Sequence, residues 1–173
     1  MKHLLQGLNI YLIGMMGTGK TTVGKLLAQK LGYRFFDTDE LIEAVAGKKI
    51  STIFAEEGEE SFRDLESKVL NEVSAYTRSA IATGGGIVRR QMNWSYLRQG
   101  LIIWLDTDLT ILQERLAQDQ NRPLASQLES LLNLRRPLYA QADLHYKIKE
   151  QKTPEEVANQ IIELIPSCLT LKN

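Results

Sequence analysis

The sequence predicts an α/β fold in which a five-stranded parallel sheet carries helices on both faces. Short apolar runs alternate with amphipathic stretches along the chain, and this alternation is typical of a doubly wound parallel sheet. Residues 101–106 are almost continuously hydrophobic, as expected for a strand that is covered on both faces. The 173 residues suit one α/β domain, so we expect residues 1–173 to form a single domain.

The strands are predicted from runs of bulky apolar or aromatic residues that stop at glycines or acidic turns. The first run, residues 10–13, ends abruptly at Gly14. The last run alternates polar and apolar residues, which favours an edge position in the sheet. The predicted strands are residues 10–13, 33–36, 79–83, 101–106 and 145–149.

Three helical segments are predicted between the second and third strands. Thr38 is expected to cap the first segment, which Gly47 ends. Ser51 is expected to cap a short second helix, and Gly58 to separate it from a third helix that reaches about Tyr76.

The second half of the chain continues the alternation of strands and helices. The polar, proline-broken residues 118–124 are predicted to form a mobile loop. Thr153 and Pro154 are expected to open the last helix as its cap and its first residue. The other predicted helices cover residues 92–97, 108–117 and 128–142.

Composition excludes several classes of protein. Lysine plus arginine (21) balances aspartate plus glutamate (21), so no net field attracts nucleic acid or an anionic membrane. Cys168 has no partner for an internal disulfide, and His3 and His145 are too isolated to build a zinc site. No signal peptide is evident, and no apolar run approaches the roughly 20 residues that span a bilayer. We therefore expect a cytoplasmic protein.

Residues Gly14 to Thr21 read Gly-Met-Met-Gly-Thr-Gly-Lys-Thr and match the phosphate-binding pattern G-x-x-x-x-G-K-[ST]. The match lies between a predicted strand and a helix whose apolar stripe covers residues 23–31. Glycines let backbone N–H groups approach a polyphosphate, Lys20 reaches its β- and γ-phosphates, and Thr21 can ligate Mg²⁺. The alternative is a glycine-rich turn that only joins strand to helix. The pattern indicates a nucleoside triphosphate but not the acceptor of its phosphate.

Three turns that follow strands are expected to meet, because ligands of parallel sheets bind beyond the carboxyl ends of the strands. These turns begin at Gly14, Asp37 and Gly84. Asp37 and Asp39 are two residues apart, which turns both side chains to one side of an extended chain. One carboxylate could hold Mg²⁺ through water while the other accepts a proton from an attacking hydroxyl. Alternatively, one of them only caps the following helix.

Glycines and arginines elsewhere are less specific when they are taken singly. The triplet Gly84-Gly85-Gly86 could bring backbone N–H groups close to a ligand or could be only a flexible connection. Arg63 and Arg135, each alone, are more typical of solvated helix residues than of ligand clamps. Arg122 lies beside a proline in the predicted mobile loop and is a candidate for stabilising a transferred phosphoryl group.

Together these motifs closely resemble the shikimate kinase family, in family order from about residue 8 to 165. The motifs are the phosphate loop, Asp37-Thr38-Asp39, Phe62-Arg63-x-x-Glu66, Thr83-Gly84-Gly85-Gly86, Arg122-Pro123-Leu124 and Arg135-x-Pro137-Leu138-Tyr139. The resemblance implies a P-loop NTPase-type α/β/α sandwich of the nucleoside-monophosphate-kinase kind. It also implies a substrate-binding segment over about residues 38–66 and a mobile lid over about 117–127.

The resemblance implies phosphorylation of the 3-hydroxyl of shikimate by ATP and Mg²⁺, a step in chorismate and aromatic amino-acid synthesis. Asp39 would be the base and would contact the ring hydroxyls, and Lys20 and Arg122 would neutralise the phosphates. The implied nucleotide-binding residues are Gly17, Thr18, Gly19, Lys20, Thr21, Thr22 and Arg122. The implied shikimate-binding residues are Asp39, Arg63, Gly85, Gly86 and Arg135, with Thr21 and Asp37 holding the metal. Guanidinium groups suit a carboxylate because they bind it bidentately.

Some details stay open at the level of sequence. Arg136 is an alternative to Arg135 as the clamp, and Ala125 stands where the family often has a leucine, which bears on lid dynamics. Arg115 and residues 151–154 are weak candidates for adenine contacts. A gluconate or nucleoside-monophosphate kinase is the rival enzyme, and a catalytically silent nucleotide-binding relative is the rival of another class. We expect a monomer because no long apolar stripe is left unassigned.

Overall fold

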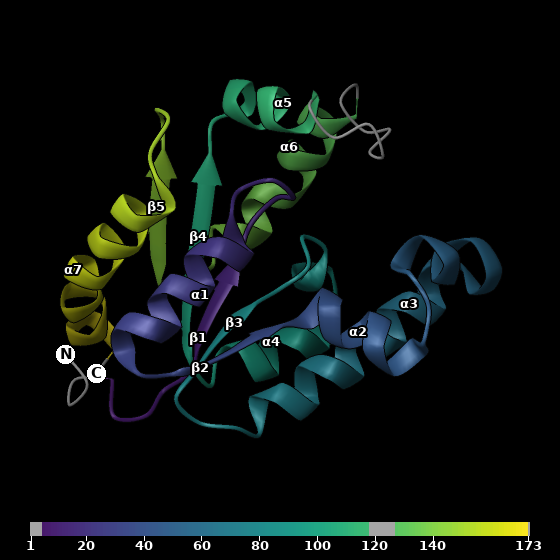
Figure 1. Cartoon of the computed structure of the whole chain (residues 1–173), viewed down its shortest axis with the longest axis horizontal. Helices are drawn as coiled ribbons and strands as arrows, with labels where there is room; N and C mark the ends of the chain where they lie inside the picture. Colours follow the sequence, from purple (N-terminus) through teal and green to yellow (C-terminus); the bar gives the residue numbers. More distant parts are fainter. Residues whose placement is uncertain (1–4, 118–126, 173) are drawn as a thin grey trace.

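The computed structural model describes residues 5–117 and 127–172 and has the predicted alternation of strands and helices (Figure 1). The elements are β1 (Ile10–Ile13), α1 (Lys20–Leu31), β2 (Arg34–Asp37), α2 (Thr38–Ala46), α3 (Ile50–Ser74), β3 (Ser79–Ala82), η1 (Ile87–Arg89), α4 (Gln91–Leu97), β4 (Leu101–Thr107), α5 (Leu109–Ala117), α6 (Leu128–Tyr139), β5 (Leu144–Ile148) and α7 (Pro154–Lys172).

The five strands form one parallel sheet in the order β2-β3-β1-β4-β5. β1 lies at the centre, where Leu12 is opposite Ala82 of β3 on one side and Ile103 of β4 on the other. β5 is an edge strand, as its alternating sequence predicted. The predicted α/β fold class is therefore confirmed.

The two faces of the sheet are covered by different helices. Along β1, Ile10 and Leu12 pack into the core beneath α1 and α7, whereas Tyr11 and Ile13 pack into the core beneath α3, α4, α5 and α6. Successive side chains of a strand point to opposite faces, so a strand of four apolar residues supplies both cores. The result is a three-layer sandwich whose central strands are fully buried.

α2 and the first part of α3 project away from the sheet in Figure 1 and have a small core of their own. This core contains Ile42 of α2 and Ile53 and Phe62 of α3. α3 is kinked at Gly58, whose dihedral angles are φ 84° and ψ 174°. The predicted break at Gly58 is thus present as a kink within one helical segment.

The cap predicted at Ser51 is wrong. α3 already begins at Ile50, whose N–H donates to Oε1 of Glu43 at 3.1 Å. Because this carboxylate of α2 satisfies a free N–H at the helix start, the helix begins before Ser51.

The second half agrees with the predictions more closely. α7 begins at Pro154, and Thr153 caps it reciprocally: the Glu156 N–H donates to Thr153 Oγ1 at 3.2 Å and the Thr153 N–H donates to Glu156 Oε2 at 2.7 Å. α6 ends at Tyr139, earlier than predicted, because the chain tightens there into turns such as Ala142 N–H to Tyr139 O at 3.0 Å.

The loop predicted at residues 118–124 lies outside the described residues. No helix in the described part of the chain combines the length and the apolarity needed to cross a bilayer.

Candidate active site

The phosphate loop connects β1 to α1, and two of its side chains donate hydrogen bonds to its own carbonyl groups. Lys20 is buried, and its Nζ donates to the carbonyl oxygens of Gly14 and Met15, both at 2.8 Å. Thr18 Oγ1 donates to the same Met15 oxygen at 3.0 Å. Gly19 caps α1 with φ 92°, a left-handed angle that a side chain would strain. This geometry holds an ammonium group and the free N–H groups of a helix start around one loop, which suits a polyphosphate.

Asp37, the last residue of β2, accepts hydrogen bonds from the first turns of α1 and α2. Its Oδ2 accepts from Thr21 Oγ1 at 2.5 Å, and its Oδ1 accepts from the N–H groups of Asp39 at 2.9 Å and Glu40 at 3.3 Å. Asp37 is therefore the N-cap of α2, and the prediction of Thr38 as the cap is wrong. Thr38 Oγ1 instead accepts from the Gly84 N–H at 3.2 Å, which ties α2 to the glycine triplet.

The Thr21 and Asp37 oxygens fit a magnesium ion chemically. A hydroxyl and a carboxylate oxygen lie side by side at the mouth of the phosphate loop, and hard divalent cations prefer oxygen ligands. Capping uses Oδ1 of Asp37, whereas Oδ2 faces Thr21, so the capping role and the metal role are compatible.

The three turns predicted to meet do line one cavity of ≈ 260 Å³. Its lining residues are Met16, Gly17, Gly19, Lys20, Thr21, Asp37, Asp39, Thr83, Gly84 and Gly85. Thr22, the next residue of α1, is exposed. A larger cavity of ≈ 610 Å³ lies near the starts of β1, β2 and β3, where it is lined by residues 6–7, 32–34 and 77–78. It contains none of the predicted site residues. We place the site in the smaller cavity because it combines the phosphate loop with a carboxylate pair.

Asp39 lies in the first turn of α2 and faces the glycine triplet. A Cβ atom on Gly84 would lie 2.9 Å from Asp39 Oδ1, so a side chain there would displace this carboxylate. Burial raises the pKa of Asp39, and the charge of Asp37 raises it further, while Lys20 and Arg63 oppose both effects. A carboxylate with a raised pKa beside a phosphate loop is suited to accept a proton.

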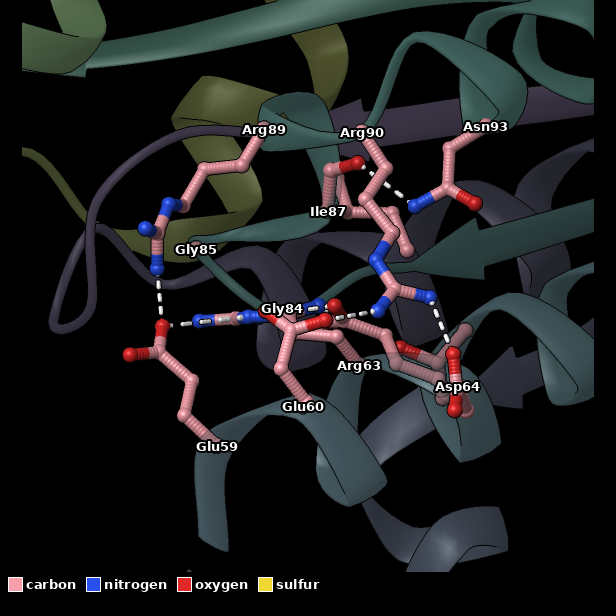
Figure 2. Close-up of polar contacts among 12 residues, drawn as sticks. Glu59, Glu60, Arg63, Asp64, Gly84, Gly85, Ile87, Arg89, Arg90 and Asn93 are labelled. Carbon is pink, nitrogen blue, oxygen red and sulfur yellow. Dashed lines mark hydrogen bonds and ion pairs between the residues drawn. The ribbon is translucent and has the colours of Figure 1, made fainter.

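Arg63 is a buried side chain of α3 that lies against Gly86. A Cβ atom on Gly86 would approach Arg63 Cζ to 2.6 Å. Arg63 Nη1 donates to Glu66 Oε2 at 2.7 Å, and Nε lies 3.6 Å from Glu59 Oε1. Figure 2 shows Glu59 between Arg63 and Arg89, so that it links the buried Arg63 to an exposed arginine. Burial raises the pKa of Glu66, against the favourable charge of Arg63.

The structure separates the two neighbouring arginines of α6. Arg135 is buried, and its Nη1 would lie 3.2 Å from a Cβ atom on Gly85. Arg136 is exposed and reaches Asp106 Oδ2 at 3.5 Å, an oxygen that also lies 2.7 Å from His145 Nε2. Of the two, Arg135 therefore borders the glycine triplet.

The weak adenine candidates lie near α5. Arg115 Nη1 donates to the Gly17 carbonyl at 3.0 Å, so this arginine contacts the phosphate loop itself. Gln151 Nε2 donates to Glu114 Oε2 at 3.5 Å, which places the β5–α7 connection beside α5. Arg122 and most of the predicted lid lie outside the described residues.

Reasoning from sequence assigned no role in the site to three residues that hold it together, although it expected Thr38 to cap a helix. They are Thr38 on Gly84, Glu66 on Arg63, and Tyr139, whose hydroxyl donates to the Gly85 carbonyl at 2.5 Å. The spacing of Glu66 three residues after Arg63 was a detectable signal, because such residues are neighbours on a helix. The contacts of Thr38 and Tyr139 span 46 and 54 residues, and no local pattern reports them.

Comparison with known proteins identifies the family. The family model described as "Shikimate kinase" matches residues 16–166. Shikimate kinases of Trichormus variabilis and Nostoc punctiforme are 57% and 55% identical, each over 98% of this chain and 97% of the relative. A shikimate kinase from Acinetobacter baumannii, solved in complex with shikimate, superposes with a TM-score of 0.87 at 39% identity, covering 96% of this chain and 97% of that one. The enzyme from Aquifex aeolicus superposes with a TM-score of 0.81 at 35% identity, covering 91% and 96%. The chain therefore belongs to the shikimate kinase family, whose members are ATP-dependent small-molecule kinases.

Proposed function

We propose that the chain transfers the γ-phosphoryl group of ATP, with Mg²⁺, to the 3-hydroxyl of shikimate, giving shikimate 3-phosphate and ADP. The observation that carries this proposal is the cavity that Lys20 of the phosphate loop and Asp39 of α2 both line. Two buried arginines stand beside the glycine triplet that forms one wall of this cavity. Family membership, and a solved relative that binds shikimate, support the same acceptor.

Arg63 and Arg135 would hold the carboxylate of shikimate. They come from α3 and α6 and border adjacent glycines, Gly86 and Gly85. Two planar guanidinium groups near one point can bind a carboxylate through several charge-assisted hydrogen bonds. The absence of side chains at Gly85 and Gly86 lets both guanidinium groups approach the backbone of the glycine triplet, beside the cavity that Asp39 lines.

Asp39 would orient the 3-hydroxyl and accept its proton. As the hydroxyl oxygen bonds to the γ-phosphorus, the bond from phosphorus to the β,γ-bridging oxygen breaks and ADP leaves. The hydroxyl proton passes to Asp39 Oδ and from there to solvent. A raised pKa makes the ionised Asp39 a stronger base than an exposed aspartate.

The phosphate loop would bind the nucleotide. The N–H groups of Gly17 to Thr22 would donate to the phosphates of the nucleotide, and Lys20 would balance their charge. Thr21 and Asp37 would hold Mg²⁺, which supplies charge neutralisation at the β- and γ-phosphates. We assign to Arg122 a contact with the transferred group, and to residues 117–127 a lid over it, from the family resemblance alone.

The whole chain would act as one kinase domain, a cytoplasmic monomer that needs no nucleic acid or membrane. The zero net charge supports the last point, because no net field of the protein attracts nucleic acid or an anionic membrane.

The experiment that tests the function measures ADP release by purified protein with ATP and Mg²⁺, offering shikimate, gluconate and AMP in turn. We expect turnover with shikimate only, and ³¹P NMR of the product should place the phosphate on the 3-hydroxyl. Turnover with gluconate or AMP would assign a rival kinase activity. Nucleotide binding without turnover on any acceptor would indicate a silent relative.

A further inference from the structure

Tyr139, the last residue of α6, joins parts of the site that are far apart in sequence. Its side chain is fully buried at 0% exposure, and its hydroxyl donates to the Gly85 carbonyl at 2.5 Å. The same oxygen lies 3.6 Å from Met15 Sδ of the phosphate loop. One hydroxyl thus contacts the glycine triplet after β3 and the loop after β1.

Tyr139 is also a direct neighbour of Arg135. The two residues are four positions apart on α6, which puts them on the same side of the helix. Burial raises the pKa of Tyr139 to about 12, against the charge of Arg135 and a side-chain hydrogen bond with it. The phenol therefore stays protonated and remains a hydrogen-bond donor at physiological pH.

We propose that Tyr139 is a positioning residue for the acceptor, which fixes the Gly85 carbonyl and the Arg135 guanidinium in one geometry. This inference rests on the proposed function, because it takes Arg135 as a ligand of the shikimate carboxylate. Fixing the Gly85 carbonyl also fixes the peptide plane shared by Gly85 and Gly86, and so the direction of the Gly86 N–H. The Arg135 guanidinium and the Gly86 N–H then both depend on one hydroxyl.

A packing role alone would need only the ring. The ring lies 5.7 Å from that of Trp104 and belongs to the core on this face of the sheet. A phenylalanine would fill the same volume, yet it would leave the half-buried Gly85 carbonyl without the hydroxyl that donates to it. An effect that depends on the hydroxyl therefore distinguishes positioning from packing.

The test is Tyr139→Phe, with Tyr11→Phe as the matched control. Tyr11 of β1 is also 0% exposed and lies in the same core, but its hydroxyl bonds to Ser74 Oγ at 2.9 Å, and Ser74 is not a residue of the proposed site. Both variants lose one buried hydroxyl, so their melting temperatures should fall by similar amounts. For Y139F we expect KM for shikimate to rise about tenfold, with KM for ATP within about twofold of wild type. For Y11F both KM values should be unchanged.

Calorimetry of shikimate binding to wild type, Y139F and Y11F tests the positioning role of Tyr139 separately from the proposed function. Equal affinity for shikimate in Y139F and Y11F would overturn the positioning role, as would a parallel rise of KM for ATP in Y139F. Wild-type protein that binds shikimate without phosphorylating it would overturn the proposed function, while a loss of affinity confined to Y139F would still support the positioning role. Wild-type protein that does not bind shikimate at all would overturn both.

Discussion

The two halves of the candidate site are built in opposite ways. The phosphate side is one contiguous loop, Gly14 to Thr21, in which Lys20 and Thr18 bond to the loop's own carbonyl groups. The acceptor side takes Asp39 from α2, Arg63 from α3, the glycine triplet from the end of β3 and Arg135 from α6. The first half is local in sequence, and the second exists only after the chain has folded.

The two halves also differ in what they present to a ligand. The phosphate loop offers backbone N–H groups and one ammonium, which suit any nucleoside triphosphate. The acceptor side offers side-chain charges that are buried or half-buried and must compensate one another. Arg63 is paired with Glu66, and the pKa values of Glu66 and Asp39 are both raised by burial. Specificity for the acceptor therefore depends on charged side chains whose burial costs free energy. Replacing any one of them should have a large and selective effect.

The largest effect is expected for Asp39→Asn. Removing the base should lower kcat about 10³-fold, while the affinity for ATP stays close to wild type. Steady-state kinetics and a nucleotide-binding titration measure the two quantities. The matched control is Glu40→Gln, which changes the exposed neighbouring carboxylate. Normal turnover by D39N would remove Asp39 from the role of base.

The same variant should be more stable than wild type at neutral pH. The pKa of Asp39 is raised in the folded state, so its protonated form is favoured by folding. Its contribution to stability is present below the ordinary pKa of 3.8 and is lost as pH rises through the raised value. At pH 7 the ionised group therefore destabilises the fold, and asparagine removes this cost. Melting temperatures at pH 7 and near pH 4 should show the D39N advantage shrinking toward the acid end.

The second effect is a selective loss of acceptor binding in Gly86→Ala. Gly86 has φ −95°, so the backbone accepts alanine, but the new Cβ would lie 2.6 Å from Arg63 Cζ. Arg63 is held by Glu66 and Glu59 and cannot move aside freely. KM for shikimate should rise roughly ten- to a hundredfold with KM for ATP unchanged, since small displacements of a clamp cost this much.

Gly47→Ala is the control for G86A. Gly47 has φ 67° and open space around it, so alanine there costs stability without touching the site. Equal changes of both KM values in G86A would contradict this prediction, because they would show that the phosphate side and the acceptor side do not respond independently.

A change on the phosphate side should alter the magnesium requirement and leave acceptor binding unchanged. Thr21→Val keeps the shape of the side chain but removes the hydroxyl that bonds to Asp37 Oδ2. The Mg²⁺ concentration for half-maximal activity should rise about tenfold, whereas shikimate binding should not change. Magnesium titrations of activity measure the shift, with Thr110→Val on the exposed face of α5 as the control. An unchanged magnesium requirement would exclude Thr21 as a metal ligand.

The same contrast explains what the sequence could predict. The parallel sheet followed from alternating patterns, and the phosphate loop from eight consecutive residues. Arg63 and Arg135, by contrast, look like ordinary solvated helix residues, because helical spacing does not reveal which residues another element covers. Only the resemblance to a family singled them out.

The capping of α2 is a smaller example of the same limit. Asp37 and Thr38 are both good N-cap residues, so local preference does not choose between them. The choice depends on Gly84, whose N–H donates to Thr38 Oγ1 from the end of another strand. Asp37 is then left to cap α2 and to face Thr21.

The smallest effect is expected for Arg90→Ala, just outside the acceptor side. Arg90 pairs with Glu60 at 2.7 Å and with Asp64 at 2.6 Å, and Figure 2 shows it between these carboxylates of α3. Both partners are largely exposed, so we expect a loss below about 1 kcal/mol in the free energy of unfolding, which 1 M salt should abolish. Neither KM should change, because the acceptor side depends on the buried pair of Arg63 and Glu66. Urea denaturation at low and high salt, together with kinetics, tests this. A rise in KM for shikimate like that of G86A would extend the acceptor side to the surface ion pairs.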